Sequence, residues 1–124
     1  VKLADRLNGE IISADSRQIY KGMDIGTGKD LSEYSIGNTT IDYHLINILD
    51  PSENYSVFQF KKDYQKVFKS INQKDKLPIL CGGTGLYLES ILLDYKMPET
   101  KPDLQLREEL EKDDMKVLIN KFAT

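Results

Sequence analysis

The segment Asp15-Ser16-Arg17-Gln18 carries four side chains that could do chemistry, directly after an apolar stretch at residues 10–14. A carboxylate at the end of a strand can act as a general base or hold a metal through water. Ser16 both donates and accepts hydrogen bonds, Arg17 is a fixed cation, and the Gln18 amide can pair with a base edge. Asp15 also fits the cap of a following helical turn, which is the commoner role for this local pattern.

The glycine-rich turn Gly82-Gly83-Thr84-Gly85 is a second candidate site, because it lies between an apolar run and a helical pattern. Glycines let the backbone approach a ligand closely, and free N–H groups at a helix start attract anions. Thr84 adds a hydroxyl that can reach a phosphate oxygen. The same residues also fit a plain strand-to-helix turn with Thr84 as N-cap, so both interpretations stay open.

Residues 22–29 resemble a P-loop but do not match its pattern, G-x-x-x-x-G-K-[ST]. Five residues rather than four separate Gly22 from Gly28. Asp30 stands where the magnesium-binding hydroxyl belongs, and its charge would repel phosphate. The segment also does not follow an apolar strand. The sequence therefore contains no P-loop of its own.

Two isolated residues, His44 and Arg107, are weaker candidates for a site. His44 is the only histidine and alternates with apolar residues, so we interpret it as structural. The sequence shows neither zinc-site spacing nor a carboxylate–histidine–nucleophile arrangement. Arg107 lies one turn into a predicted helix, where arginine is usually solubilising but could also meet an RNA phosphate or base.

The hydrophobic periodicity predicts an α/β domain with a parallel sheet. Buried strands are expected at residues 10–14 and 76–81. The clearest helix covers residues 56–73, where Ser56 is the expected cap and the aromatic residues up to Phe68 are interpreted as core. The other predicted segments are a helix ending near residue 7, a helical turn at 17–20, a loop at 21–38, an extended segment at 40–49, helices at 86–93, 103–112 and 115–122, and a linker between Pro98 and Pro102.

The composition is that of an ordinary globular domain, with 124 residues, 40% hydrophobic and 30% charged. The net charge of −3 gives no overall attraction to nucleic acid, so any RNA contact must be local. No apolar run approaches the roughly 20 residues that span a bilayer, and no secretion signal is recognisable. A single cysteine suits a reducing compartment. We therefore expect a cytoplasmic protein without a membrane partner.

Taken in order along the chain, these motifs resemble the tRNA dimethylallyltransferase family, also called tRNA isopentenyltransferases. The resemblance covers residues 3–107. It is carried by the long block from Gly9 to Lys29, and then by His44-Leu45, Asp50-Pro51, Tyr55-Ser56-Val57 with Phe60, and the block from Pro78 to Tyr87.

The resemblance implies a P-loop NTPase-like parallel sheet flanked by helices. Residues 1–97 would form part of the catalytic core, and residues 98–124 the start of a helical tRNA-binding insertion domain. The implied reaction transfers a dimethylallyl group from dimethylallyl diphosphate to N6 of the adenosine 3′ of the anticodon, in tRNAs that read UNN codons. Mg²⁺ is the implied cofactor. The expected partners are the tRNA anticodon loop and dimethylallyl diphosphate, and the full-length protein is expected to be a monomer.

Roles are carried over by position in the motifs. Asp15 matches the family's general base, and Thr84 matches the hydroxyl at the scissile bond of the diphosphate, so both are expected to be catalytic. The resemblance leaves the metal ligands unassigned. The expected tRNA contacts are Asp15, Ser16, Arg17, Gln18, Thr84 and Arg107, and the expected diphosphate contacts are Gly82, Gly83, Thr84 and Gly85.

The sequence departs from the family pattern by lacking the P-loop G-P-T-A-S-G-K-[ST], which is expected just before Val1. We therefore expect the chain to be a piece of a longer protein and to be inactive alone. Three alternatives remain open. They are an adenylate isopentenyltransferase that acts on free adenine nucleotides, a P-loop kinase, and a non-catalytic remnant that only binds RNA.

Overall fold

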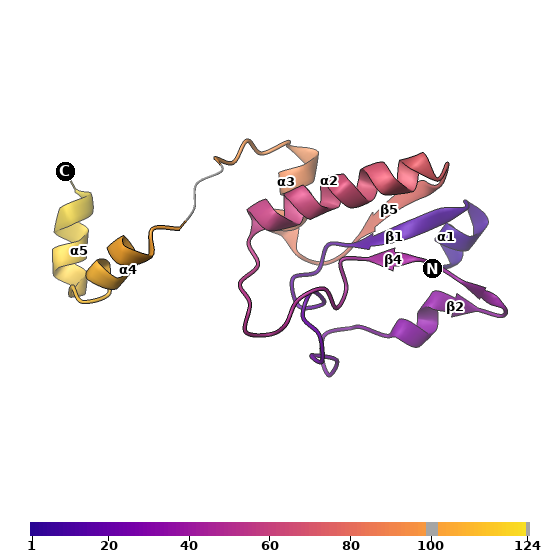
Figure 1. Ribbon diagram of the computed structural model, residues 1–124, viewed down its shortest axis with the longest axis horizontal. Helices are drawn as coiled ribbons and strands as arrows, with labels where there is room; N and C mark the ends of the chain where they lie inside the picture. The colour runs from indigo at the N-terminus through magenta and orange to yellow at the C-terminus, as the bar shows by residue number, and fades with distance from the viewer. Residues whose placement is uncertain (99–101, 124) are drawn as a thin grey trace.

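The computed structural model describes residues 1–98 and 102–123, and its centre is a parallel sheet flanked by helices (Figure 1). Strand β1 (Gly9–Ser13) lies between β4 (Tyr43–His44) and β5 (Leu77–Cys81), and it pairs in parallel with both. In this register Ile11 lies opposite Tyr43 on one side and Ile79 on the other. The predicted parallel α/β class is confirmed, and the carboxyl ends of these strands share one edge.

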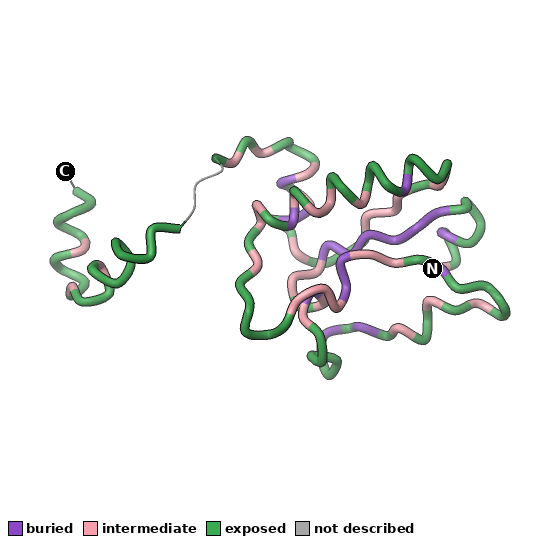
Figure 2. The backbone as a smooth tube through the Cα atoms, viewed as in Figure 1, coloured by how far each residue is buried: buried purple, intermediate pink, exposed green. Residues whose placement is uncertain are grey.

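Strand β1 is buried along its whole length because both faces of the sheet are covered (Figure 2). On one face, Ile12 joins a cluster with residues of α2 (Val57–Gln73) and α3 (Gly85–Leu92). On the other face, Ile11 packs with residues that include Ala4 of α1 (Lys2–Arg6). Successive side chains of a strand point to opposite faces, so the neighbouring Ile11 and Ile12 are buried on opposite sides of the sheet.

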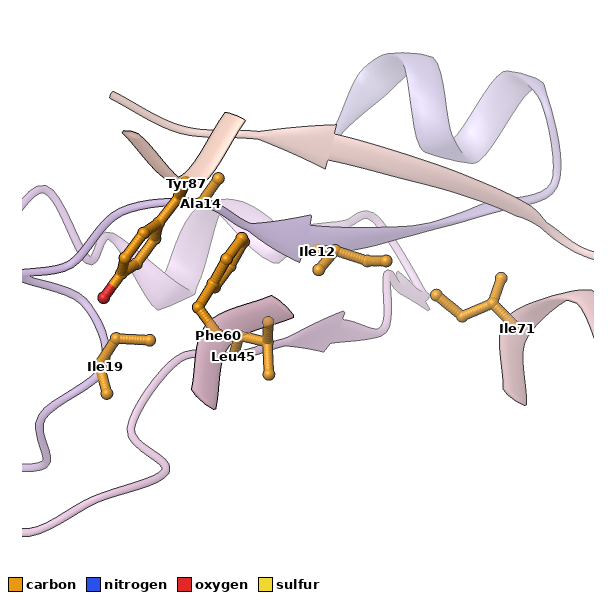
Figure 3. Close-up of a cluster of buried hydrophobic side chains, with 7 residues drawn as sticks. All are labelled: Ile12, Ala14, Ile19, Leu45, Phe60, Ile71 and Tyr87. Atoms are coloured by element: carbon orange, nitrogen blue, oxygen red, sulfur yellow. The ribbon is translucent and has the colours of Figure 1, made fainter. Parts of the chain in front are cut away.

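The centre of the larger cluster is an aromatic pair, shown in Figure 3. The rings of Phe60 and Tyr87 stack with centroids 4.1 Å apart and planes 9° apart. Phe60 and Ile12 are fully buried, and Ile71 closes the cluster from the last turn of α2. Two helices and β1 thus meet at one set of side chains, which fixes where α3 begins beside the sheet.

Helix α2 begins as predicted, with a reciprocal cap between Ser56 and Gln59. The Ser56 hydroxyl accepts from the Gln59 N–H over 3.3 Å, and the Gln59 side chain accepts from the Ser56 N–H over 2.7 Å. The expectation that Phe68 belongs to the core is wrong, since it is 39% exposed. Its ring packs against Tyr64 at a centroid distance of 5.6 Å, at the margin of the apolar stripe.

The predicted loop at residues 21–38 is wrong over its second half. A 3-10 helix, η1 (Leu31–Tyr34), is followed by the antiparallel hairpin of β2 (Ser35–Ile36) and β3 (Thr39–Thr40). The hairpin turns through Gly37, whose φ is +58°. A Gly-Asn pair between two short segments is a known hairpin signal, and the sequence interpretation missed it.

The predicted extended segment at residues 40–49 is interrupted. Strand β4 ends where Leu45 adopts a φ of +61°, and Asn47 adopts +55°. The chain then returns to the sheet, where Leu49 forms an isolated parallel bridge with Tyr20. The left-handed backbone conformations of Leu45 and Asn47 change the direction of the chain. The segment following β4 therefore lies beside the turn that follows β1.

Strand β5 was expected to be buried, and this expectation is wrong. Leu77 is 45% exposed and Cys81 is exposed, while the residues between them are half-buried. Within the described residues β5 is an edge strand, because the sheet order is β4-β1-β5. An apolar run therefore predicted the strand correctly but not its place in the sheet.

The C-terminal part of the described chain consists of α4 (Leu104–Leu110) and α5 (Met115–Phe122). The side chain of Asp103 caps α4, as predicted, although the helix ends two residues earlier than expected. Neither helix contains a buried residue. Most of the predicted linker, residues 99–101, lies outside the described residues, so the proposed domain boundary stays a prediction. Among the helices that the structure describes, none is long and apolar enough to cross a membrane.

Candidate active site

The glycine-rich turn meets the end of β1 directly. The Ala14 N–H donates to the Cys81 carbonyl over 2.7 Å, and the Thr84 N–H donates to the Ala14 carbonyl over 3.0 Å. These bonds continue the β1–β5 pairing beyond the strands. They bring Asp15 and Thr84 together at the carboxyl edge of the sheet, where parallel α/β folds bind ligands.

Glycine is required at position 82 by this close approach. A Cβ atom there would lie 2.3 Å from the carbonyl carbon and 2.4 Å from the oxygen of Ala14. At Gly83 a Cβ would lie 3.9 Å from Oδ2 of Asp15, so the carboxylate faces the turn. At Gly85, by contrast, a Cβ would meet open space. The turn therefore has one sterically essential glycine, at its contact with β1.

Thr84 occupies the N-cap position of α3, but its hydroxyl does not cap the helix. Thr84 Oγ1 instead accepts a hydrogen bond from the Ser16 N–H over 2.9 Å, and it donates one to Ser16 Oγ over 3.2 Å. The plain N-cap interpretation is thus correct for the backbone and wrong for the side chain. The hydroxyl joins the two motifs that the sequence analysis had selected separately.

Asp15 forms a turn through one carboxylate oxygen. Its Oδ1 accepts from the Arg17 N–H over 2.9 Å, and its carbonyl accepts from the Gln18 N–H over 3.1 Å. The predicted helical segment is therefore a single hydrogen-bonded turn. Arg17 also lies near Oδ1, with Nε at 3.6 Å, although its side chain is 68% exposed. Within the described residues Oδ2 has no hydrogen-bond partner, so capping and proton transfer can involve different oxygens of one carboxylate.

Gln18 is more engaged than its sequence context suggested. Its Oε1 accepts from the Ser13 hydroxyl over 2.7 Å, and its Nε2 donates to the carbonyls of Thr27 and Gly28 over 3.3 and 3.1 Å. Both amide hydrogens are therefore used within the protein, and one acceptor site remains on Oε1. The side chain ties the Asp15 turn to the following loop.

Lys29 is a buried anchor rather than a phosphate-binding lysine. Its side chain is 1% exposed, and Nζ donates to the Tyr20 carbonyl, to Asn47 Oδ1 over 2.7 Å and to Asp24 Oδ1 over 3.3 Å. The conclusion that this glycine-rich segment is not a P-loop is confirmed by these contacts. The sequence did not predict these contacts of Lys29, because the tertiary fold decides which oxygen atoms lie next to its amino group.

His44 belongs to an ionic cluster around Glu10 in β1. Its Nε2 lies 2.7 Å from Glu10 Oε2, and the Nζ atoms of Lys74 and Lys76 lie 3.0 and 2.9 Å from Oε1. Burial alone would raise the pKa of Glu10, but the hydrogen bonds from Lys76, His44 and Lys74 outweigh it and lower the pKa to about 2. The structural interpretation of His44 is confirmed. A glutamate inside an apolar strand was the signal for this cluster, and it was missed.

Arg107 is not brought together with the other candidates. It lies in α4, and no hydrogen bond or ion pair of the described residues joins it to Asp15 or Thr84. A ready-made metal centre is also lacking among the described residues. Within residues 1–98 and 102–123, no group of three or more histidine, cysteine or acidic side chains is placed to hold an ion.

The fold and the site define a P-loop NTPase-like α/β protein whose candidate active site is built at the carboxyl edge of its parallel sheet. A family model described as IPP transferase matches residues 18–124. The chain therefore belongs to the IPP transferase family.

Curated relatives are named as tRNA-modifying enzymes. The chain is 55% identical over 105 residues to tRNA dimethylallyltransferase 2 of Bacteroides fragilis, covering 85% of this chain and 34% of that protein. It is 50% identical to tRNA dimethylallyltransferase 1 of Azobacteroides pseudotrichonymphae, covering 98% of this chain and 40% of that one. The chain thus spans between a third and two fifths of the length of these relatives.

The fold of this chain is also similar to solved structures of enzymes with related names. The full-length tRNA isopentenylpyrophosphate transferase of Bacillus halodurans has a TM-score of 0.72 and 40% identity, covering 98% of this chain and 41% of that one. A eukaryotic dimethylallyltransferase acting on tRNA has a TM-score of 0.77 and 32% identity, covering 97% of this chain and 30% of that one.

Proposed function

We propose that the full protein transfers a dimethylallyl group from dimethylallyl diphosphate to N6 of the adenosine 3′ of the anticodon, in tRNAs that read UNN codons. The observation that carries this proposal is the junction of the Asp15 turn with Thr84, held by the 2.9 Å bond between Thr84 Oγ1 and the Ser16 N–H. It places a carboxylate beside a glycine-rich helix start. The names of the relatives support the same reaction.

Asp15 is proposed to act as the general base through Oδ2. The exocyclic amine of adenine is a weak nucleophile, so its proton must be accepted as the new bond forms. In the proposed step, N6 attacks C1 of the dimethylallyl group, the C1–O bond to diphosphate breaks, and the N6 proton passes to Asp15. Oδ2 suits this task because the turn hydrogen bond uses only Oδ1.

The glycine-rich turn is proposed to stabilise the diphosphate leaving group. Thr84 Oγ1 accepts a hydrogen bond from the Ser16 N–H and donates one to Ser16 Oγ, and rotation of its O–H would redirect that proton to a phosphate oxygen. Backbone N–H groups of Gly82, Gly83 and Gly85 would add to this, since donors aimed at developing negative charge lower the barrier.

The tRNA is proposed to reach the site with its target base flipped out of the anticodon stack. Ser16, Arg17 and the remaining acceptor of Gln18 would then contact the nucleotide, and the exposed Arg17 is available to a phosphate. Arg107 is proposed as a further tRNA contact. These contacts are local, in agreement with the net charge of −3.

Mg²⁺ is proposed as the cofactor, and the donor set fits its usual mode. Magnesium is commonly held by one or two carboxylates together with substrate phosphates and water, rather than by a protein cage. The Ser16 hydroxyl, 3.2 Å from Thr84 Oγ1, offers one oxygen ligand, substrate phosphates and water would supply the others, and the ion would neutralise charge on the diphosphate. We further propose that the full-length protein is a cytoplasmic monomer without a membrane partner.

The reaction is tested with Asp15→Asn in the full-length enzyme. Loss of the base should lower kcat roughly 10²–10⁴-fold while tRNA binding changes much less. Asp42→Asn is the matched control, since that carboxylate is 56% exposed and interacts with Lys76 rather than with the site. Wild-type turnover by the Asp15 variant would refute the assignment. Prenylation of AMP or ADP but not of tRNA would instead identify an adenylate isopentenyltransferase.

A further inference from the structure

The loop at residues 21–30 is held firmly although it lies at the surface. Thr27 and Lys29 are both buried despite being polar. The Thr27 hydroxyl donates to the Met23 carbonyl over 2.8 Å, and this bond adds to those that Gln18 and Lys29 make. Among the described side chains, every buried polar atom has a hydrogen-bond partner, so Thr27 and Lys29 hold the loop without an unsatisfied buried polar group.

The tip of this anchored loop is apolar. Ile25 is 100% exposed and Met23 is 45% exposed, and Figure 2 shows the tip of the loop as an exposed stretch. Burying apolar surface is favourable by roughly 25 cal/mol per Å². Because hydrogen bonds already hold this loop, a binding partner that covers Ile25 would gain apolar contact with little loss of conformational entropy in the loop.

The tip is physically linked to the candidate active site. Gln18, three residues from Asp15, donates to the loop through Nε2, and Lys29 joins the loop to Asn47 in the segment after β4. The loop thus connects the carboxyl ends of β1 and β4. A molecule that places a base at Asp15 would extend over this same edge of the sheet.

The chemistry at Asp15 also suggests what the tip would contact. Extracting one base from a stacked loop leaves its neighbours partly unstacked, and proteins commonly place apolar side chains against bases in such gaps. The acidic Asp24 beside the tip is paired with Lys29 at 3.3 Å, which weakens its repulsion of RNA phosphates. Lys21 at the start of the loop is exposed and available to a phosphate.

We propose that Ile25, flanked by Met23, packs against a nucleobase that becomes unstacked when the target adenosine leaves the anticodon loop. The loop is then a specificity element that stabilises the flipped form of the RNA. This inference rests on the proposed function, because it takes the substrate to be a tRNA with an extruded adenosine. It adds a contact that lies outside the segment Asp15–Gln18.

The test measures binding of an anticodon stem-loop RNA to the full-length protein, with no turnover required. Ile25→Ser should raise the Kd about tenfold, whereas Ile25→Leu should stay within about twofold. Leu92→Ser is the matched control, since that side chain is 78% exposed on α3, and it should leave the Kd unchanged. Thermal midpoints and binding of dimethylallyl diphosphate should be the same in all variants.

A second set of RNAs, each abasic at one neighbour of the target adenosine, completes the test. If Ile25 packs on a base, one abasic RNA should bind wild type about tenfold more weakly and abolish the effect of Ile25→Ser. Equal RNA affinities of wild type and Ile25→Ser overturn the inference, as does a lower thermal midpoint with weakened diphosphate binding. Failure of the proposed function is recognised separately, because it appears as tight RNA binding without prenyl transfer by the wild type.

Discussion

The hydroxyl oxygen of Thr84 lies 2.9 Å from the backbone nitrogen of Ser16 and accepts its hydrogen bond across 68 positions of the chain. This bond joins the start of α3 to the turn that follows β1. It replaces the helix-capping bond that a threonine at an N-cap usually makes. The geometry of the candidate site is therefore connected to the stability of the protein through one side chain.

Thr84→Val should destabilise the protein by about 1–3 kcal/mol, because the part-buried Ser16 N–H loses its acceptor. Thr84→Ser keeps the hydroxyl and should lose less than about 0.5 kcal/mol. Urea unfolding of the two variants measures the difference. A Val variant as stable as the Ser variant would show that water replaces the threonine oxygen without penalty.

Gly82→Ala should be severely damaging, since the new Cβ would lie 2.3 Å from the Ala14 backbone, which cannot move without disrupting the β1–β5 pairing. We expect a loss of about 3 kcal/mol or more. Gly85→Ala should be neutral or slightly stabilising, because its Cβ meets open space and alanine favours the first turn of α3. Thermal unfolding distinguishes the two, and equal tolerance would contradict the close approach.

Stability in acid should depend on Glu10. Its pKa is lowered from an ordinary value of 4.5 to about 2, because hydrogen bonds from Lys76, His44 and Lys74 outweigh the opposing effect of burial. A carboxyl with a lowered folded-state pKa stabilises the protein above the unfolded value, and that contribution is lost as the pH falls toward the folded value. The loss should therefore occur between about pH 4.5 and pH 2.

Glu10→Gln isolates this contribution. The variant should be about 2–3 kcal/mol less stable than wild type at pH 7, and the difference should shrink toward zero near pH 2. Asp42→Asn serves as a control at the exposed rim of the cluster, where a surface pair contributes at most about 1 kcal/mol. A pH-independent difference between Glu10→Gln and wild type would mean that packing, not charge, is lost.

Lys29→Met should release the loop that carries Ile25. The substitution leaves the Tyr20 carbonyl and Asn47 Oδ1 without their buried donor, which should cost about 2–4 kcal/mol. Amide hydrogen exchange in residues 21–28 should accelerate at least about tenfold. Lys21→Met, at an exposed position, should change neither quantity. Unchanged protection in the Lys29 variant would show that Gln18 alone holds the loop.

Local patterns predicted the features that depend on neighbours in the chain. The capping box of α2 could be predicted because Ser56 and Gln59 are three residues apart and hydrogen-bond to each other's backbone N–H groups. Strand β1 could be predicted from the consecutive apolar residues Ile11 and Ile12, which are buried on opposite faces of the sheet. The hairpin at Gly37 was also accessible through its turn signal, and it was missed only because the surrounding segment resembles a loop.

Other features could not be predicted, because they depend on which segments become neighbours in space. The exposure of β5 follows from its edge position in the sheet, and an apolar run does not encode strand order. Similarly, the partners of Lys29 include Asn47, 18 positions away, and those of Glu10 include Lys74, 64 positions away. Such contacts form only when the whole domain folds.

The sequence by itself determined the family and the parallel α/β class, and it selected Asp15 and Thr84 as candidate site residues, because long motifs and periodic patterns are properties of the chain. Only the tertiary structure decided that Thr84 holds the Ser16 N–H, that Asp15 keeps one oxygen unpaired, and that Gln18 and Lys29 fix a loop with Ile25 at its tip. The physical reason is the parallel sheet. It aligns the carboxyl ends of distant strands at one edge, and hydrogen bonds across that edge then assign each polar atom its partner.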